Sequence, residues 1–256
     1  MRAFRFLAMA LGVLACNTGA QAACESGLAE RIHASLYPSR ALDERLAACK
    51  AWPAYPGRIV VVLPMPRTIS GSGARMYDLE VLLVQRPDNG NTDRDRVTAR
   101  LFQPDALEDD GLVIEDIRID TARYVLATDA RAFGLRVRYR GGAGAHRFAS
   151  ETLRLYLPQE KDLREVLPEI EIDRDSGEWD AACNGQTEQL RTMLSTARTS
   201  SEGFADLALA RTVTRTRAQR QDDGACLDKP SPAEYSRALL RYDGAHFRVP
   251  KSLRAP

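Results

Sequence analysis

Acidic side chains gather in two short segments of the chain. The first segment holds Asp88, Asp93 and Asp95, and the second holds Asp105, Glu108, Asp109 and Asp110. Apolar stretches typical of strands flank both segments, so we expect the segments to be loops between strands. Carboxylates held together on a rigid sheet attract a basic surface of another protein and speed its association. The sequence therefore predicts a partner-binding role for these residues, with residues 105–110 as first choice and 88–95 as second; solvated loops are the alternative.

A third acidic segment, residues 173–178, alternates oxygen-bearing side chains ahead of a glycine. This pattern begins like a calcium-binding loop of the EF-hand type. The glutamate that such a loop needs at its twelfth position would fall at Asn184. A weak calcium site therefore stays an open alternative, and we predict no metal and no cofactor.

Other reactive side chains form no recognisable constellation. The three histidines, His33, His146 and His246, do not share a spacing that would bind one metal ion. The serine- and glycine-rich residues 70–73 match neither a nucleophile elbow nor a phosphate-binding loop with its lysine. The sequence therefore predicts no catalytic residue, and we expect the protein not to be an enzyme.

The N-terminus has the pattern of a bacterial export signal. A short basic start precedes the apolar residues 6–15, and small residues at 20–22 suit cleavage before Ala23. The apolar run is too short to span a membrane. We expect residues 1–22 to be removed and the mature protein to be soluble in the periplasm. In the alternative, Cys16 is lipidated and the protein is an outer-membrane lipoprotein.

Four cysteines remain under either interpretation: Cys24, Cys49, Cys183 and Cys226. In an oxidising compartment they would form two disulfides, for which three connectivities exist. We expect the two local pairings, Cys24 with Cys49 and Cys183 with Cys226. Each such bond would stabilise the fold by about 2–4 kcal/mol. Free buried thiols are the alternative.

The mature chain is large enough for one large domain or two modest ones. Removal of 22 of the 256 residues leaves 234, which bury an ample core. The removed segment contains Arg2 and Arg5 and no acid, so 34 basic residues face 35 acidic ones and the net charge is −1. This balance argues against a nucleic-acid-binding protein.

Apolar residues in residues 23–57 recur every three or four positions in two runs, which a Pro-Ser pair separates. The runs are Leu28, Ile32 and Leu36, then Leu42, Leu46 and Cys49. This spacing predicts two helices, and a bond between Cys24 and Cys49 would join their outer ends. Residues 23–57 are therefore expected to form a helical hairpin.

The remaining chain has the patterns of β-strands. Expected strands in a first β-rich module, residues 58–158, are 58–63, 78–84, 97–102, 112–119, 133–139 and 152–157. A second β-rich module, residues 159–256, is expected to begin with a short helix or turn at 159–166. It continues with strands at 169–173 and 204–216 and ends in a hairpin at 235–249, whose turn holds Asp243 and Gly244. The predicted fold class is α+β: a helical hairpin, then a mostly antiparallel sandwich or meander stapled by disulfides.

An export signal, cysteines for two disulfides, a β-rich body and no enzyme motif make up the layout of this chain. The layout resembles periplasmic immunity proteins that neutralise antibacterial effectors, such as the phospholipase toxins delivered by type VI secretion. The resemblance covers the layout alone and carries over no functional residue. It implies an inhibitor whose partner is a toxic envelope enzyme. An envelope structural or assembly factor and an envelope hydrolase remain open alternatives.

Overall fold

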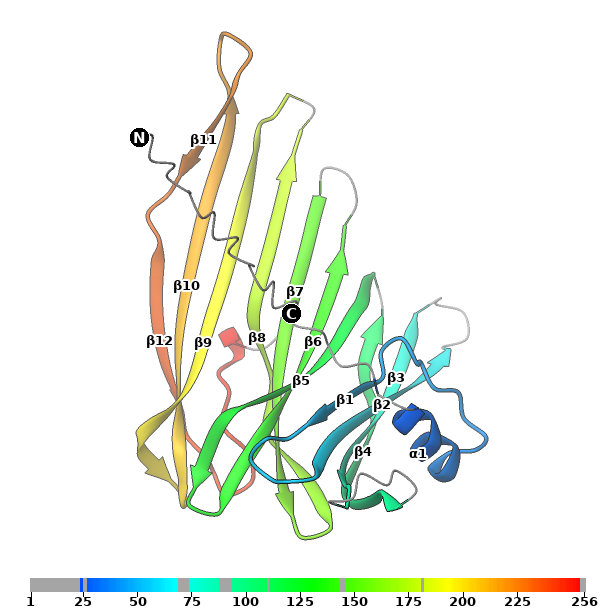
Figure 1. Ribbon diagram of the computed structural model, residues 1–256. Coiled ribbons are helices and arrows are strands. Elements are labelled where there is room, and N and C mark those ends of the chain that lie inside the picture. The colour runs from blue at the N-terminus through cyan, green and yellow to red at the C-terminus, as the bar shows by residue number, and fades with distance from the viewer. Residues whose placement is uncertain are drawn as a thin grey trace, which may run out of the picture.

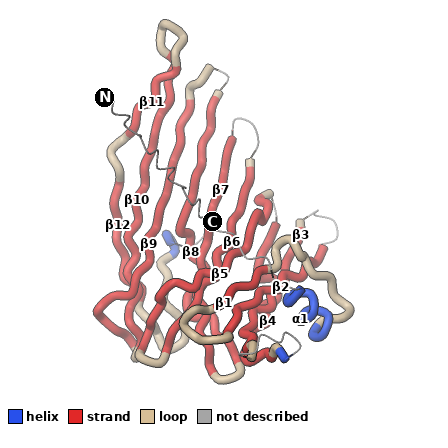
Figure 2. Tube along the Cα trace, viewed as in Figure 1, coloured by secondary structure: helices blue, strands red, loops and turns tan. Residues whose placement is uncertain are grey.

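The structure, a computed structural model, describes Cys24 and residues 27–68, 74–87, 94–109, 111–142, 146–180 and 182–253 (Figure 1). Strands make up most of it, as the tube in Figure 2 shows. The elements are α1 (Leu28–Leu36), β1 (Ala48–Ala51), β2 (Arg58–Thr68), β3 (Arg75–Gln85), β4 (Arg96–Asp109), β5 (Leu112–Ala127), β6 (Ala130–Gly141), β7 (His146–Gln159), β8 (Asp162–Trp179), β9 (Gly185–Ser201), β10 (Phe204–Arg220), β11 (Cys226–Pro230), β12 (Glu234–Leu240) and the 3-10 helix η3 (Lys251–Leu253).

All twelve strands belong to one mixed sheet. Its main path runs β1-β2-β3-β4-β8-β7-β6-β5, and β9 pairs with β8. Strand β10 then pairs with β9 along one edge and with β11 and β12 along the other. Only the short contact between β4 and β8 is parallel. The protein is therefore mostly β with one α-helix in the described residues, and the predicted α+β class is wrong.

The predicted N-terminal helical hairpin is wrong in its second half. Helix α1 ends at Leu36, just before the Pro-Ser break, but the next run forms a turn and then β1. Leu46 packs into one hydrophobic core, whereas Leu42 and Cys49 pack into another on the opposite side of the sheet. A helix would have put these side chains on one face. The helix-like spacing of Leu42, Leu46 and Cys49 therefore comes from a turn followed by a strand, not from a helix.

Most predicted strands are present, and several are longer than expected. The six expected strands between residues 58 and 157 lie within β2 to β7. The expected helix or turn at 159–166 is a tight turn at residues 160–161, after which β8 begins at Asp162. The expected acidic loop at 105–110 is strand β4 as far as Asp109. Strand β9 was not predicted because its side chains are mostly polar on both faces, and the five-residue strand β11 was not predicted either.

Three hydrophobic cores stabilise the part of the sheet that lies at the bottom of the view in Figure 1. The first contains Trp52, Phe133 and Tyr156, and the ring of Phe133 contacts the rings of the other two. The second packs β6, β7 and β8 against β10, β12 and the C-terminal segment. The third lies between α1 and the faces of β2 and β3. The apolar run at the start of β2 is buried on both faces, because alternate side chains enter the first and third cores.

Both predicted disulfides are confirmed. Cys24 is bonded to Cys49 in β1, and Cys183 in the β8–β9 turn is bonded to Cys226 at the start of β11. Two disulfides indicate an oxidising environment outside the cytoplasm. Among the described residues, no helix has the length and apolar character that crossing a membrane requires.

The C-terminal hairpin differs from the prediction in its pairing. Strand β12 pairs with β10, and after it a bridge from Tyr242 to Phe247 closes a tight turn. The Asp243 carboxylate accepts bonds from the backbone of Ala245 and His246, and Gly244 supplies the left-handed conformation with φ 94°. The turn is therefore present, whereas the chain beyond it packs into the second core.

The long strands continue beyond the cores as a single layer (Figure 1). We call this part the extended sheet: residues 146–150 of β7, 173–179 of β8, 185–191 of β9 and 213–220 of β10, with β11. No residue in 173–180, 185–189 or 213–217 is buried. Because neighbouring residues of a strand point to opposite faces, both faces of this layer meet solvent.

Candidate binding surface

Asp105, the first of the predicted partner-binding residues, lies in β4 and already has partners. Its carboxylate forms an ion pair with Arg67, and its backbone N–H donates to Asp78 Oδ1 at 2.8 Å. The Asp105 side chain is nevertheless about half exposed (53%). The pairing with Arg67 removes much of the negative field that a partner would meet.

Glu108 and Asp109 lie at the end of β4, opposite the first residues of β3, and are more accessible than Asp105. Glu108 is exposed and has no ion pair in the described part of the chain, whereas Asp109 is half-buried and lies opposite Arg75 in register. Asp110 lies outside the described residues. Glu108 is therefore the most accessible acidic group of this segment.

The second predicted segment is less suited to binding. Asp95 is only 6% exposed, and Arg86 donates to its two oxygens at 3.1 and 2.9 Å. Asp88 and Asp93 lie outside the described residues. Asp95 comes directly before β4 whereas Asp109 ends it, so the two acidic segments lie at opposite ends of a 14-residue strand. The structure does not bring them together.

The three histidines also lie apart. His33 is buried in α1, and burial together with nearby Arg40 lowers its pKa. His246 lies in the turn after β12, and His146 begins β7. Among the described residues, no group of three or more metal-binding side chains is present.

A buried acidic cluster beside α1 was missed by sequence reasoning. Glu80 is fully buried in β3, where Tyr37 donates to its Oε2 at 2.5 Å and Arg100 donates to its Oε1 at 2.7 Å. Two residues away, Asp78 is bonded by Arg40 at 2.5 Å. The available signal was the pair of acids inside an apolar strand, since buried charges require partners.

This cluster stabilises the fold and offers no reactive group. Burial and the bond to Glu80 raise the pKa of Tyr37 to about 12, so its hydroxyl stays protonated as a donor. Both oxygens of Glu80 are occupied and the side chain has no access to solvent. A base that is fully bonded and enclosed cannot accept a proton from a substrate.

On one face of the sheet, alternating charges cross four strands. Arg174 of β8 donates to Glu188 of β9 at 3.0 Å, and Glu188 accepts from Arg215 of β10 at 2.8 Å. Arg215 also donates to Glu234 of β12 at 2.5 Å. These two carboxylates raise the pKa of Arg215. Cross-strand pairs of this kind stabilise a sheet that has no core beneath it.

The opposite face has its own ion pairs. Arg191 of β9 contacts Asp173 and Asp175 of β8, each at 3.0 Å. Strand alternation places Ser176 and Glu178 on the other face, so the oxygens of residues 173–178 do not converge as a calcium loop requires. Burial raises the pKa of Asp173, Arg191 opposes this effect and Asp175 adds to it.

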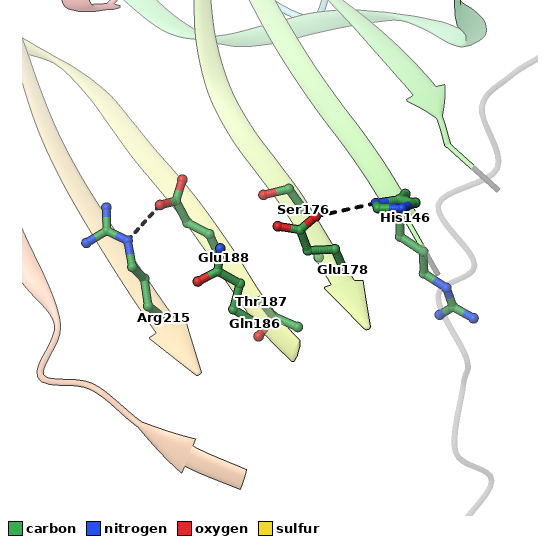
Figure 3. A pocket seen from close by; sticks show the side chains of 9 residues that line it. His146, Ser176, Glu178, Gln186, Thr187, Glu188 and Arg215 are labelled. Atoms are coloured by element: carbon green, nitrogen blue, oxygen red, sulfur yellow. Dashed lines mark hydrogen bonds and ion pairs between the residues drawn. The ribbon is translucent and has the colours of Figure 1, made fainter. Parts of the chain in front are cut away.

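A shallow hollow of about 320 Å³ lies on the face that carries Glu188 and Arg215 (Figure 3). His146 at its rim faces Glu178, with 3.5 Å between Nδ1 and Oε2. A neighbouring hollow of about 590 Å³ is lined by Trp179, Asn184 and other residues near the strand ends. Both hollows lie on the extended sheet, and none of the predicted partner-binding residues lines them.

The hollow does not have the geometry of a hydrolytic site. Ser176 lies beside the His146–Glu178 pair, but no hydrogen bond joins Ser176 to His146 in the described residues. The side chains of His146 and Glu178 are 74% and 59% exposed. A nucleophile needs a hydrogen-bonded base and donors for the developing charge. Among the described residues, the hollow does not show this arrangement.

Comparison of the chain with protein-family models, with curated proteins and with solved structures finds no match.

Proposed function

We propose that this protein is a periplasmic binding module that inhibits another protein. In its specific form, it is an immunity protein that neutralises a toxic envelope enzyme such as a phospholipase. The two disulfides support a location outside the cytoplasm. The layout of the sequence supports the immunity role.

The binding role rests on the extended sheet, which is accessible on both faces. Ion pairs between its own strands keep this accessible layer ordered. The chain of pairs from Arg174 to Glu234 and the Cys183–Cys226 bond hold the layer in place without a core. A layer held in this way presents a large, ordered surface at little cost in conformational entropy on binding. Large ordered surfaces are what protein partners require.

The acidic end of β4 supports the inhibitor role. A phospholipase cleft holds an anionic phosphate and is therefore expected to be basic. Glu108 is exposed at the end of a rigid strand, with Asp109 next to it. Carboxylates in this position would draw a basic cleft toward the sheet and speed its association.

The decisive experiment first asks whether an envelope toxin, such as a phospholipase, is encoded beside this gene, and then uses that toxin in purified form. The purified toxin hydrolyses phosphatidylglycerol vesicles with and without the mature protein, and cells are scored for survival when both are exported. We expect a 1:1 complex, loss of hydrolysis and protection of the cells. Full hydrolysis in the presence of excess protein would contradict the inhibitor role, as would turnover of lipids by the protein alone.

A further inference from the structure

The edge strands β5 and β12 differ in whether other groups bond their outer backbone atoms. At β5, Arg45 donates to the backbone carbonyl of Ile114 at 3.3 Å, and Lys50 donates to that of Ile119 at 3.0 Å. These side chains occupy groups that another strand would use. At β12, by contrast, no strand pairs with the outer edge and no side chain bonds its backbone in the described part of the chain. The outer edge of β12 is therefore open for pairing.

The face beside this open edge is unusually apolar. Tyr235 and Leu239 of β12 are 79% and 44% exposed and lie two strand positions on either side of Arg237. In the neighbouring strand, Ala210 and Ala208 lie in register with Arg237 and Leu239. The small alanines leave the inner flanks of the larger side chains uncovered.

The apolar area continues into the next strand. Met193 of β9 is 75% exposed and lies in register with Ala210. We call this surface the β12 platform: Tyr235, Arg237, Leu239, Ala208, Ala210 and Met193. These residues lie on one face of β9, β10 and β12, at the sheet edge formed by β12 (Figure 1). Exposed apolar surface at an open edge is the usual mark of a strand-binding site.

The charges of the platform indicate which partner it accepts. Arg237 forms no ion pair with any described residue, whereas Arg191, which lies on the same face, pairs with two aspartates. The platform contains no acid. A second copy paired antiparallel about Arg237 would place two guanidinium groups opposite each other, which is unfavourable. An incoming strand with a carboxylate opposite Arg237 is favoured instead.

We propose that the partner protein adds an extended segment to the outer edge of β12. The proposal rests on the protein-binding function proposed above and adds a docking site at β12 to the extended sheet and the acidic end of β4. The segment has the pattern apolar-x-acidic-x-apolar, because residues opposite Tyr235, Arg237 and Leu239 lie two positions apart on one face. Its backbone bonds to β12, its carboxylate pairs with Arg237, and its apolar side chains cover Tyr235 and Leu239.

The test uses the full mature chain and a synthetic peptide containing Val-Thr-Glu-Thr-Val, with a second peptide in which lysine replaces the glutamate. Binding is followed by amide NMR shifts of the labelled protein. We expect shifts confined to β12 and the platform. Arg237→Glu should weaken binding of the glutamate peptide about fivefold or more and should favour the lysine peptide. Arg198→Glu, at an exposed position outside the platform, is the matched control and should change neither affinity.

Three results would overturn the proposal. The first is amide NMR shifts that lie outside β12 and the platform, or that are absent at millimolar peptide. The second is equal binding of both peptides by the wild type and by Arg237→Glu, and the third is self-association in sedimentation that Arg237→Glu abolishes. The last would make a second copy the occupant. The toxin assay separates this proposal from the function. If Arg237→Glu inhibits the toxin as well as the wild type, docking at β12 is wrong while the inhibitor role holds. If Arg237→Glu reverses the preference between the two peptides but the protein inhibits no toxin, the β12 docking site is supported and the immunity role fails.

Discussion

Tyr37 donates its phenolic hydrogen to Glu80 across 2.5 Å, and so ties the segment after α1 to a carboxylate buried in β3. The same hydroxyl accepts a bond from Arg100 at 2.8 Å. The helix is thus anchored to the sheet by a polar contact at its C-terminal end and by the third core along its length.

Replacement Tyr37→Phe should lower the free energy of unfolding by about 1–3 kcal/mol, because one oxygen of the buried Glu80 loses its donor. Urea unfolding measures the change. Tyr235→Phe is the matched control, since that side chain is 79% exposed, and it should stay within about 0.5 kcal/mol of the wild type. Equal stability of both variants would show that the Tyr37 contact contributes nothing.

Replacing both Cys183 and Cys226 with serine should loosen the extended sheet without unfolding the cores. The bond spans 43 residues and links the β8–β9 turn to the start of β11, so its removal should cost about 2–4 kcal/mol. Hydrogen exchange should speed up in residues 185–230 and stay slow in β2 and β3. The matching change at Cys24 and Cys49 should instead release the segment before α1. Uniform acceleration over the whole chain would contradict this local effect.

The turn after β12 should weaken in acid. Backbone N–H groups of His246 and Ala245 lower the pKa of Asp243 to about 2, below its value of about 3.9 in an unfolded chain. Its contribution is therefore complete above about pH 4 and is lost as the pH falls through about 2. NMR titration should give the low pKa directly. Asp243→Asn should remove this part of the acid sensitivity; an unchanged pH profile would refute the assignment.

Changing Glu108 and Asp109 to lysine should slow association with a basic partner and weaken the salt dependence of that step. The change at Glu108 should affect folding little, because Glu108 is exposed and has no ion pair among the described residues, whereas a lysine at the half-buried Asp109 would face Arg75 and cost some stability. Stopped-flow association with the toxin gives the rate, and Glu108→Gln with Asp109→Asn separates loss of charge from reversal. An unchanged association rate in the lysine variant would rule out electrostatic steering by this segment.

Asp95→Ala should destabilise the protein rather than act on binding. The Asp95 side chain is 6% exposed and accepts both bonds from Arg86. Removing it leaves the guanidinium without these acceptors, at a cost of about 1–3 kcal/mol. Thermal unfolding measures the loss. Should Asp95→Ala retain full stability but lose partner binding, the interpretation of this residue as structural would be wrong.

Local patterns in the sequence were sufficient for the strands of the cores and for the disulfides. The apolar run at the start of β2 and the alternation in β6 each predict a strand, because side-chain period is a local property of the chain. The pairings Cys24–Cys49 and Cys183–Cys226 join cysteines that are nearest in sequence, so no long-range information was needed.

Tertiary contacts decided what local patterns left ambiguous. Leu42 and Leu46 have helical spacing, but β2 offers a pairing edge that draws the following residues into β1, and the two leucines enter different cores. Asp109 continues β4 because it pairs with Arg75 of β3, whereas Asp105 lies at an irregularity in that pairing, where its backbone N–H donates to the Asp78 side chain. In β9, polar side chains gave no strand signal. Its pairing with β8 and β10, through Arg174, Glu188 and Arg215, depends on residues far apart in the chain.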